Sequence, residues 1–202
     1  MAECVGLKPQ SLDWCEGAVN LPGIRRDVYF IAKRDVLLFP TRKTEYVTGM
    51  GEIATLTGNF TLASEGVAPA VTSAFWKKLS VIVDKSPVTS ASQGTKPSKS
   101  FLNSATFVHP GVEEDAAAFC ALANNDDYLY LVQTKNGKYR LIGNEMYQTE
   151  TNPSQNLGAE ATSEMGTTIE VSVTDSIPAP FYTGEIIVGP DPLVDVINKA
   201  GA

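Results

Sequence analysis

The stretch from residue 111 to residue 143 decides the fold: GVEEDAAAFCALANN is followed directly by DDYLYLVQTKNGKYRLIG. The first part has apolar residues at helical spacing, namely Val112, Ala116, Phe119, Leu122 and Ala123. The second part has two strand-like runs around Asn136-Gly137, the strongest short signal for a hairpin turn. A single helix feeding a hairpin, in a chain that otherwise resembles strands and loops, predicts a mainly β protein with one flanking helix.

The ends of the helix and the register of the hairpin can be predicted too. Three acidic residues at 113–115 lie in the first helical turn, where the helix dipole favours negative charge, and Asn124 is typical of a helix end. A two-residue type I′ turn at Asn136-Gly137 places Val132 opposite Leu141. One face of the hairpin then carries Tyr130, Val132, Tyr139 and Leu141.

Further strands are predicted from alternation and from β-branched or aromatic content. They cover 28–32, 36–39 after a break at Lys33–Asp35, 52–62, 75–83, 101–108, 168–174 and 177–188. In the strand at 168–174, Ile169, Val171 and Val173 are expected to point inward. We expect 75–83 to pair with 101–108 across a long polar loop, and we expect 147–164 to consist of turns.

These elements predict one domain over residues 1–202, a β-sandwich or small barrel. It has an N-terminal arm at 1–22, a long loop at 85–100 and a C-terminal tail at 189–202 of weak helical character. The loop is rich in Ser and Thr and contains three lysines, Lys85, Lys96 and Lys99, and no acid. A loop of this length in a compact domain is usually functional or disordered.

Composition narrows the possible classes of function. No apolar run approaches the ~20 residues that span a bilayer, and no secretory signal opens the chain, so we expect folding in a cytosol and no membrane partner. The net charge is −7, which argues against a protein that binds the phosphates of nucleic acids. Residues 1–110 carry 12 basic and 9 acidic side chains and residues 111–202 carry 4 and 14, so opposite charges could steer like copies together.

The chain lacks a recognisable catalytic pattern. His109 is the only histidine, and the three cysteines, Cys4, Cys15 and Cys120, form no CxxC pair. The carboxylate pair Asp126-Asp127 falls between helix and strand, where turn residues are expected. We therefore predict no catalytic residue, no cofactor and no metal site, and a protein that is not an enzyme.

Several passages, taken in order, resemble the major tail tube protein of long-tailed bacteriophages, and most of all versions from phages of Bacteroidetes-type hosts. They are VYFI at 28–31 with RDV at 34–36, the helix at 113–125, DYLYLV at 127–132, NGKYRLIG at 136–143, LG at 157–158 before GTTIEV at 166–171, and PAPFYTG at 178–184. Together they cover about two thirds of the chain. None is a catalytic signature, and it is their order that carries the resemblance.

The resemblance implies a virion structural protein, assembled in the host cytoplasm, whose copies form hexameric rings that stack into the tail tube. Its partners would be other copies and the terminator, tape measure and baseplate or hub proteins, while DNA passes through the lumen without specific binding. We expect Glu52 or Glu170, on polar strand faces, to line that channel. We expect the loop at 85–100, with Lys85, Lys96 and Lys99, to bridge subunits or rings.

Other classes of function remain open on the sequence. A carbohydrate-binding or adhesin-like β-sandwich would need an exposed aromatic platform, for which Trp14, Trp76, Tyr147 and Tyr182 are the candidates. Another virion component, such as a head–tail connector or a decoration protein, would also fit, as would the tube protein of a secretion system.

Overall fold

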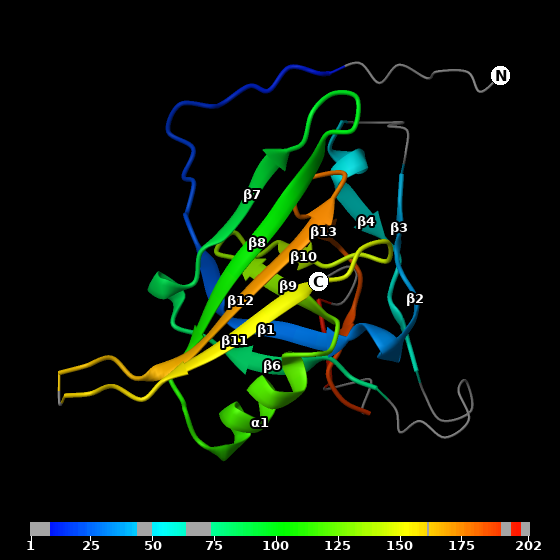
Figure 1. Cartoon of the computed structure of the whole chain (residues 1–202). Coiled ribbons are helices and arrows are strands. Elements are labelled where there is room, and N and C mark those ends of the chain that lie inside the picture. Colours follow the sequence, from blue (N-terminus) through cyan, green and yellow to red (C-terminus); the bar gives the residue numbers. More distant parts are fainter. Residues whose placement is uncertain (1–8, 44–49, 64–73, 161, 191–194, 199–202) are drawn as a thin grey trace.

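The computed structural model describes residues 9–43, 50–63, 74–160, 162–190 and 195–198. The protein is mainly β, with one α-helix, and its strands form two larger sheets and two small ones (Figure 1). Residues 9–22 precede the first strand, contain no strand or helix and are exposed. The prediction of a mainly β fold with one helix is confirmed.

The larger sheet has seven strands in the order β3-β4-β13-β10-β9-β1-β6. Their bounds are β3 Thr41–Arg42, β4 Thr55–Thr57, β13 Phe181–Tyr182, β10 Tyr139–Ile142, β9 Tyr128–Thr134, β1 Ile24–Ala32 and β6 Lys77–Ser80. All pairs are antiparallel except β13 with β4, which is parallel. The central strands β10, β9 and β1 are buried on both faces.

The second sheet has four strands in the order β11-β12-β8-β7, all antiparallel. Their bounds are β11 Glu150–Asn156, β12 Gly166–Asp175, β8 Ser100–His109 and β7 Val88–Gln93. This sheet lies in front of the seven-stranded sheet in Figure 1, and its strands cross those of β1 and β9 obliquely. Two small sheets, β2 (Val36–Leu38) with β5 (Thr61–Leu62) and β14 (Ile186–Ile187) with β15 (Val196–Ile197), complete the set.

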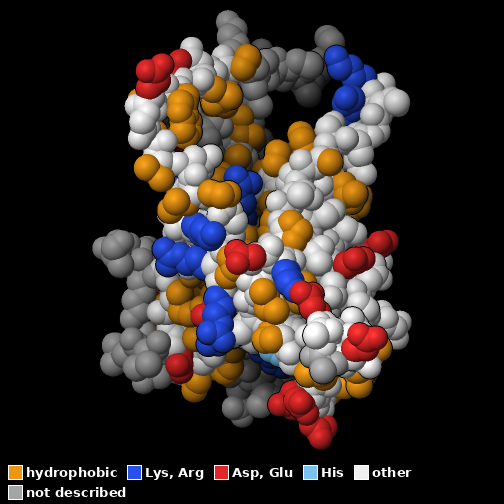
Figure 2. All heavy atoms as spheres, turned by 90° about the vertical axis from the view of Figure 1, so that its left-hand side faces the viewer, with side chains coloured by type: hydrophobic (Ala, Val, Ile, Leu, Met, Phe, Trp, Pro, Cys, Tyr) orange, Lys and Arg blue, Asp and Glu red, His pale blue; other side chains and the backbone are white. Residues whose placement is uncertain are grey.

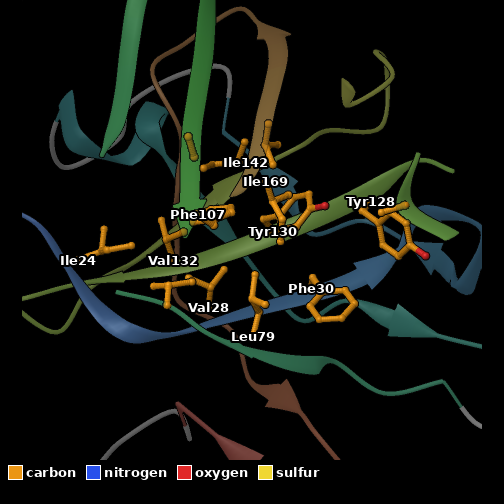
Figure 3. Packing of buried hydrophobic residues seen from close by; sticks show 14 of the residues in the cluster. Ile24, Val28, Phe30, Leu79, Phe107, Tyr128, Tyr130, Val132, Ile142 and Ile169 are labelled. Carbon is orange, nitrogen blue, oxygen red and sulfur yellow. The ribbon is translucent and has the colours of Figure 1, made fainter. Parts of the chain in front are cut away.

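One hydrophobic core fills the space between the two larger sheets. The seven-stranded sheet supplies Val28, Phe30, Tyr130, Val132 and Ile142, and the four-stranded sheet supplies Ala105, Phe107, Ile169, Val171 and Val173 (Figure 3). The inward positions predicted for β12 are confirmed, because Ile169, Val171 and Val173 are all buried. Burying one such side chain stabilises the fold by ~1.5–3 kcal/mol, so the packing of the two sheets against each other through this core holds the sandwich together.

A second core lies on the opposite face of the seven-stranded sheet. It contains Tyr29, Leu129, Leu131, Tyr139 and Leu141 from that sheet, with Phe60, Trp76 and Ile186 from the segments that cover it. Phe60 packs edge-on against Trp76, with ring centroids 5.3 Å apart. Because β1, β9 and β10 serve two cores, most of the buried side chains on both faces of these strands are apolar.

The helix α1 (Glu114–Ala123) covers one end of the sandwich. Phe119 packs edge-on against Phe30 at 5.0 Å, and Ala123 is buried in the first core, which confirms the predicted stripe. Leu122 differs from expectation, since it is 65% exposed. Three short 3-10 helices, η1 Lys33–Asp35, η2 Met50–Ala54 and η3 Val83–Lys85, occupy connections, and η1 confirms the predicted break between β1 and β2.

The predicted hairpin exists, but its register was wrong by one residue. Val132 lies opposite Arg140 and Leu131 opposite Leu141, and the turn closes with the Thr134 amide donating to the carbonyl of Lys138. The loop thus has three residues, 135–137, and ends in a glycine, Gly137, with a φ of 88°. A one-residue slip moves side chains to the other face, so Tyr139 and Leu141 join the second core rather than the first.

The predicted loop at 85–100 was also wrong. Residue 85 ends η3, residues 88–93 form the edge strand β7, and the turn is confined to residues 94–99. The pairing of 75–83 with 101–108 was wrong as well, because β6 pairs with β1, whereas β8 lies between β7 and β12. β7 was not predicted because it is short and consists mostly of Ser, Thr and Gln, so no apolar alternation marks it as the strand that pairs with β8.

Three further segments differ from their predictions. The 147–164 segment, expected to be turns, contains β11, in which Pro153 is tolerated because β11 is an edge strand. The single strand expected at 52–62 is replaced by η2, β4 and β5, and that at 177–188 by β13 and β14. The tail expected to be weakly helical contains the strand β15, and its residues 191–194 and 199–202 lie outside the described residues.

Candidate functional site

The outer face of the four-stranded sheet is polar, acidic and exposed to different degrees. Alternation along each strand and the pairing register place sixteen side chains on it: Thr89, Ala91 and Gln93; Ser100, Leu102, Ser104, Thr106 and Val108; Thr168, Glu170, Ser172 and Thr174; and Glu150, Asn152, Ser154 and Asn156. The charged members are Glu150 and Glu170, and the face carries no Lys or Arg. All the charged side chains on this face are therefore negative.

The two carboxylates lie at neighbouring positions on adjacent strands. Glu150 is opposite Ser172, and Glu170 is opposite Asn152 one step along the sheet. Both side chains are exposed, and neither forms an ion pair among the described residues. Sequence reasoning found Glu170 from the alternation of β12 but missed Glu150, because β11 was not recognised as a strand.

The sheet ends in two open edges, β7 on one side and β11 on the other. Each pairs with one strand, and among the described residues no other strand covers its outer side. Successive strands alternate in direction, so with four strands the two edge strands run in opposite directions (Figure 1). Open edges present unpaired N–H and C=O groups that can pair with another chain. On β11 the outward-facing positions are Thr151, Pro153 and Gln155, and Pro153 offers a carbonyl but no N–H.

The hydrogen-bond pattern shows which groups of β7 face the open edge. The Thr106 amide donates to the carbonyl of Pro87 at 3.0 Å, so 87 and 106 form a hydrogen-bonded pair in the register of β7 with β8. Such pairs alternate in an antiparallel ladder, which directs Thr89, Ala91 and Gln93 to β8. The backbone groups of Val88, Ser90 and Ser92 therefore face outward.

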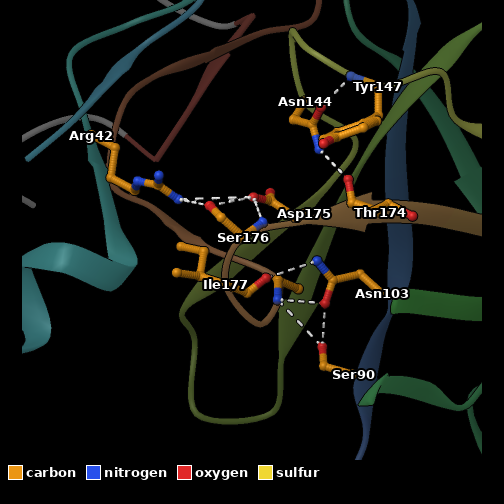
Figure 4. Close-up of polar contacts among 10 residues, drawn as sticks. Arg42, Ser90, Asn103, Asn144, Tyr147, Thr174, Asp175, Ser176 and Ile177 are labelled. Atoms are coloured by element: carbon orange, nitrogen blue, oxygen red, sulfur yellow. Dashed lines mark hydrogen bonds and ion pairs between the residues drawn. The ribbon is translucent and has the colours of Figure 1, made fainter. Parts of the chain in front are cut away.

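A buried polar cluster holds the β7 edge in place (Figure 4). Asn103, on β8, is 1% exposed; its amide nitrogen donates to the Ile177 carbonyl at 3.1 Å. Its side-chain oxygen accepts from the Ser90 hydroxyl at 2.6 Å and from the Ala179 amide at 2.9 Å. The cluster joins β7 and β8 to the segment that leads into β13, and so ties the edge to the seven-stranded sheet.

A second polar contact joins the two sheets near the far end of β12. The Arg42 guanidinium lies 3.8 Å from the Asp175 carboxylate and donates to the Ser176 hydroxyl at 2.9 Å (Figure 4). Arg42 belongs to β3 at the edge of the seven-stranded sheet, and Asp175 ends β12. Both contacts limit sliding of one sheet over the other.

The three lysines expected to contact neighbouring copies do not lie together. Lys85 is in η3, before β7, and pairs with the Glu164 carboxylate. Lys96 and Lys99 lie in the turn after β7, at the other end of that strand, where the hairpin projects at the top of Figure 1. The structure therefore assigns them to opposite ends of the sheet.

Glu52 and Glu170, the two residues expected to line a channel, are also separated. Glu170 is on the outer face of β12 as predicted. Glu52 lies in the 3-10 helix η2 rather than in a strand, next to the far edge of the seven-stranded sheet, and pairs with Lys43 at 2.9 Å. Of the two, Glu170 alone shares a face with a second carboxylate.

The aromatic platform expected of a carbohydrate-binding module does not assemble from its four candidates. Trp76 and Tyr182 are each 2% exposed and belong to the second core. Trp14, in the irregular segment before β1, and Tyr147, between β10 and β11, are exposed. Stacking on a sugar requires ring faces open to solvent, which two of the four lack.

The titratable residues considered in the sequence have structural partners. Asp127 pairs with Lys33 at 3.3 Å and Asp126 with Arg34 at 3.0 Å, so both carboxylates connect the start of β9 to η1. A ring nitrogen of His109 lies 2.8 Å from the Ser80 carbonyl. Burial raises the pKa of the Cys120 thiol, which lies half-buried on α1. These contacts confirm the interpretation of Asp126-Asp127 as residues of the connection.

Among the residues that the structure describes, no group of three His, Cys, Asp or Glu side chains is placed to hold a metal ion. The one helix in that part of the chain is too short to cross a membrane. Comparisons with protein-family models, curated proteins and solved structures returned no match to this chain.

Proposed function

We propose that this chain is a structural subunit that polymerises edge to edge through its four-stranded sheet, forming rings that stack into the tail tube of a virion. The observation that carries the proposal is the sheet itself: four antiparallel strands, both edges open among the described residues, and an outer face with two carboxylates and no basic residue.

The directions of the edge strands suit repetition around a rotation axis. Rotation about the axis leaves every copy pointing the same way, so β11 of one copy meets β7 of the next. Because these two strands run in opposite directions, the new pair is antiparallel and the alternation continues without a break. A heterologous contact of this kind forms a ring if the rotation closes, and hexameric rings are the form expected from the resemblance.

The outer face then becomes the inner wall of the tube. Glu150 and Glu170 would repeat once per copy and give the lumen a negative potential. DNA phosphates would be repelled rather than bound, so the genome could pass without sticking. The remaining Ser, Thr and Asn side chains on this face are neutral and keep the wall hydrated.

The proposal extends to partners and location. The main partner is the chain itself, with tail terminator, tape measure and baseplate or hub proteins at the ends of the tube. The virion tail is the proposed location, reached after assembly in the host cytoplasm. The turn with Lys96 and Lys99 projects beyond the sheet and is a candidate contact between stacked rings.

Electron microscopy of the purified protein over a range of concentrations tests this function. Rings of uniform diameter, or tubes built from them, are expected as the concentration rises, with a lumen lined by the four-stranded sheet. A protein that remains a monomer at every concentration and binds a glycan on an array would overturn the proposal.

A further inference from the structure

A groove of about 700 Å³ opens beside the β7 edge. One wall consists of residues 86–90, which include the start of β7, and the opposite wall carries Lys138, Arg140 and Phe181. Figure 2 views the molecule from the side toward which the β11–β12 hairpin projects in Figure 1, and shows basic side chains beside a hollow in the middle of that face.

The groove holds two cations that have no anionic partner in the part of the chain that the structure describes. The Arg140 guanidinium lies 4.2 Å from the centre of the Phe181 ring, and the Lys138 ammonium lies 5.6 Å from it. Arg140 donates to the Ala179 carbonyl at 3.1 Å, and neither cation pairs with a carboxylate among the described residues. No Asp or Glu is among the described residues that line the groove. Burial lowers the pKa of Arg140, which reflects the cost of holding its charge away from water.

The hairpin between β11 and β12 has complementary properties. It projects from the body at the lower left of Figure 1 and carries the exposed acids Glu160 and Glu164. Glu164 pairs with Lys85 of the same chain, whereas Glu160 forms no ion pair among the described residues. Leu157 and Met165, at the base of the hairpin, are 72% and 51% exposed. An acidic tip with apolar flanks suits a groove that has cations over an aromatic ring.

The strand directions bring these two features to the same place. β11 ends at Asn156, immediately before the hairpin, and β7 begins at Val88, in the wall of the groove. When β11 of one copy pairs antiparallel with β7 of the next, the end of the first strand lies beside the start of the second. The hairpin of one copy therefore emerges next to the groove of its neighbour.

We infer that the β11–β12 hairpin of one copy docks in the groove of the next copy, with Glu160 against Lys138 and Arg140. This contact rests on the proposed edge-to-edge assembly and adds the side chains that select the partner edge. Charge pairs across an interface mainly determine specificity and association rate, so the contact would direct β11 to β7 and disfavour pairing of two like edges.

Reciprocal charge reversal tests the contact. Glu160→Lys and Lys138→Glu, both at exposed positions, should each raise the concentration for half-maximal association in sedimentation velocity by about tenfold or more, because like charges would face each other. A 1:1 mixture of the two variants should restore association. In an alternating array, the two introduced side chains, which are opposite in charge, would face each other at one interface. At the next interface the unmodified Glu160 would face the unmodified Lys138.

The control variant is Glu113→Lys, an exposed acid on the helix side with the same change in charge, which should associate like the unmodified chain. If the unmodified chain associates but Glu160→Lys associates equally well, or if the mixture fails to recover, the docking contact is wrong and the edge pairing stands. If the unmodified chain does not associate at all, the proposed function fails with it.

Discussion

At the scale of single residues, Asn103 shows how a buried polar group can position an assembly edge. Its side chain makes three hydrogen bonds inside the sandwich, to groups on β7 and on the segment at 177–179. A buried amide is favourable only when it is satisfied, and its partners depend on it in turn. The cluster therefore fixes one arrangement of β7 relative to β13.

Asn103→Ala should lower the free energy of unfolding by about 1–3 kcal/mol, because the Ile177 carbonyl would lose its partner and the Ala179 amide would keep only its longer contact, 3.3 Å, with the Ser90 hydroxyl. Urea denaturation below the association concentration measures this. Asn152→Ala, at an exposed site on β11, is the matched control and should change stability by less than about 0.5 kcal/mol. Equal effects of the two substitutions would contradict the role given to the cluster.

The buried tyrosines predict a loss of stability at high pH. Burial raises the pKa of Tyr139 and of Tyr182 to about 12, whereas tyrosine in the unfolded chain ionises near pH 10. Below pH 10 both states keep the proton, so stability is unaffected. Between about pH 10 and 12 the unfolded chain releases protons that the folded chain retains, and the free energy of unfolding falls as pH rises.

Urea denaturation from pH 9 to 12 measures this fall. Tyr182→Phe should lessen it by up to about 1.4 kcal/mol per pH unit, since one differentially titrating group is removed. Tyr147→Phe, at a position that is 51% exposed, is the matched substitution outside the two cores. A slope that is the same in all three proteins would show that Tyr182 does not contribute.

At the scale of elements, strands with one strongly apolar face were predictable and polar edge strands were not. The alternation in β12 and the break at η1 follow directly from the sequence, since burial of one face imposes a period of two. β7 and β11 escaped notice because their residues are mostly Ser, Thr, Asn and Gln, and because Pro153 normally argues against a strand. Each edge strand is stabilised by pairing with the next strand of the chain, β8 or β12, whose inner face is apolar, and the polar pattern of the edge strand itself does not reveal this pairing.

The hairpin register failed for a related reason. Asn136-Gly137 fits a two-residue turn, but the structure uses a three-residue loop that ends in Gly137. The choice is made by burial of Tyr139 and Leu141 in the second core, whose existence depends on segments far away in the sequence. The candidate site was affected most by such errors, because two of the four strands that form it, β7 and β11, were not predicted.

Removing a backbone donor from the open side of β7 should weaken assembly without unfolding the chain. The partner edge already lacks one donor, because the register turns Pro153 of β11 outward. The Ser92 amide faces outward, so Ser92→Pro removes a donor from the free edge while the ladder with β8 stays intact. Ser92→Ala retains the amide and is the control. Sedimentation should find that the proline variant associates more weakly than the unmodified chain, with unchanged circular dichroism, and that the alanine variant associates normally. Association of both variants alike would exclude β7 as the joining edge.

At the scale of the whole molecule, the two larger sheets differ in role: we expect the seven-stranded sheet to contribute mainly to stability and the four-stranded sheet to form the contacts between copies. The central strands of the seven-stranded sheet, β1, β9 and β10, contribute to two cores, one on each face, whereas the four-stranded sheet keeps one face and two edges open in the part of the chain that the structure describes. Residues 85–100 include the edge strand β7, so their deletion would remove that strand and the Ser90 contact rather than trim a surface loop. Single substitutions at the edge are therefore the sharper test of assembly.

Amide hydrogen exchange, compared between dilute and concentrated protein, tests the joining of β7 to β11 most directly. Unpaired edge amides exchange readily, and pairing with a neighbour should slow them. Peptides covering Val88–Gln93 and Glu150–Asn156 are expected to gain protection together on association, while β6, at the edge of the other sheet, should not. Association that leaves both peptides as exchangeable as in the dilute protein would contradict the edge-to-edge account.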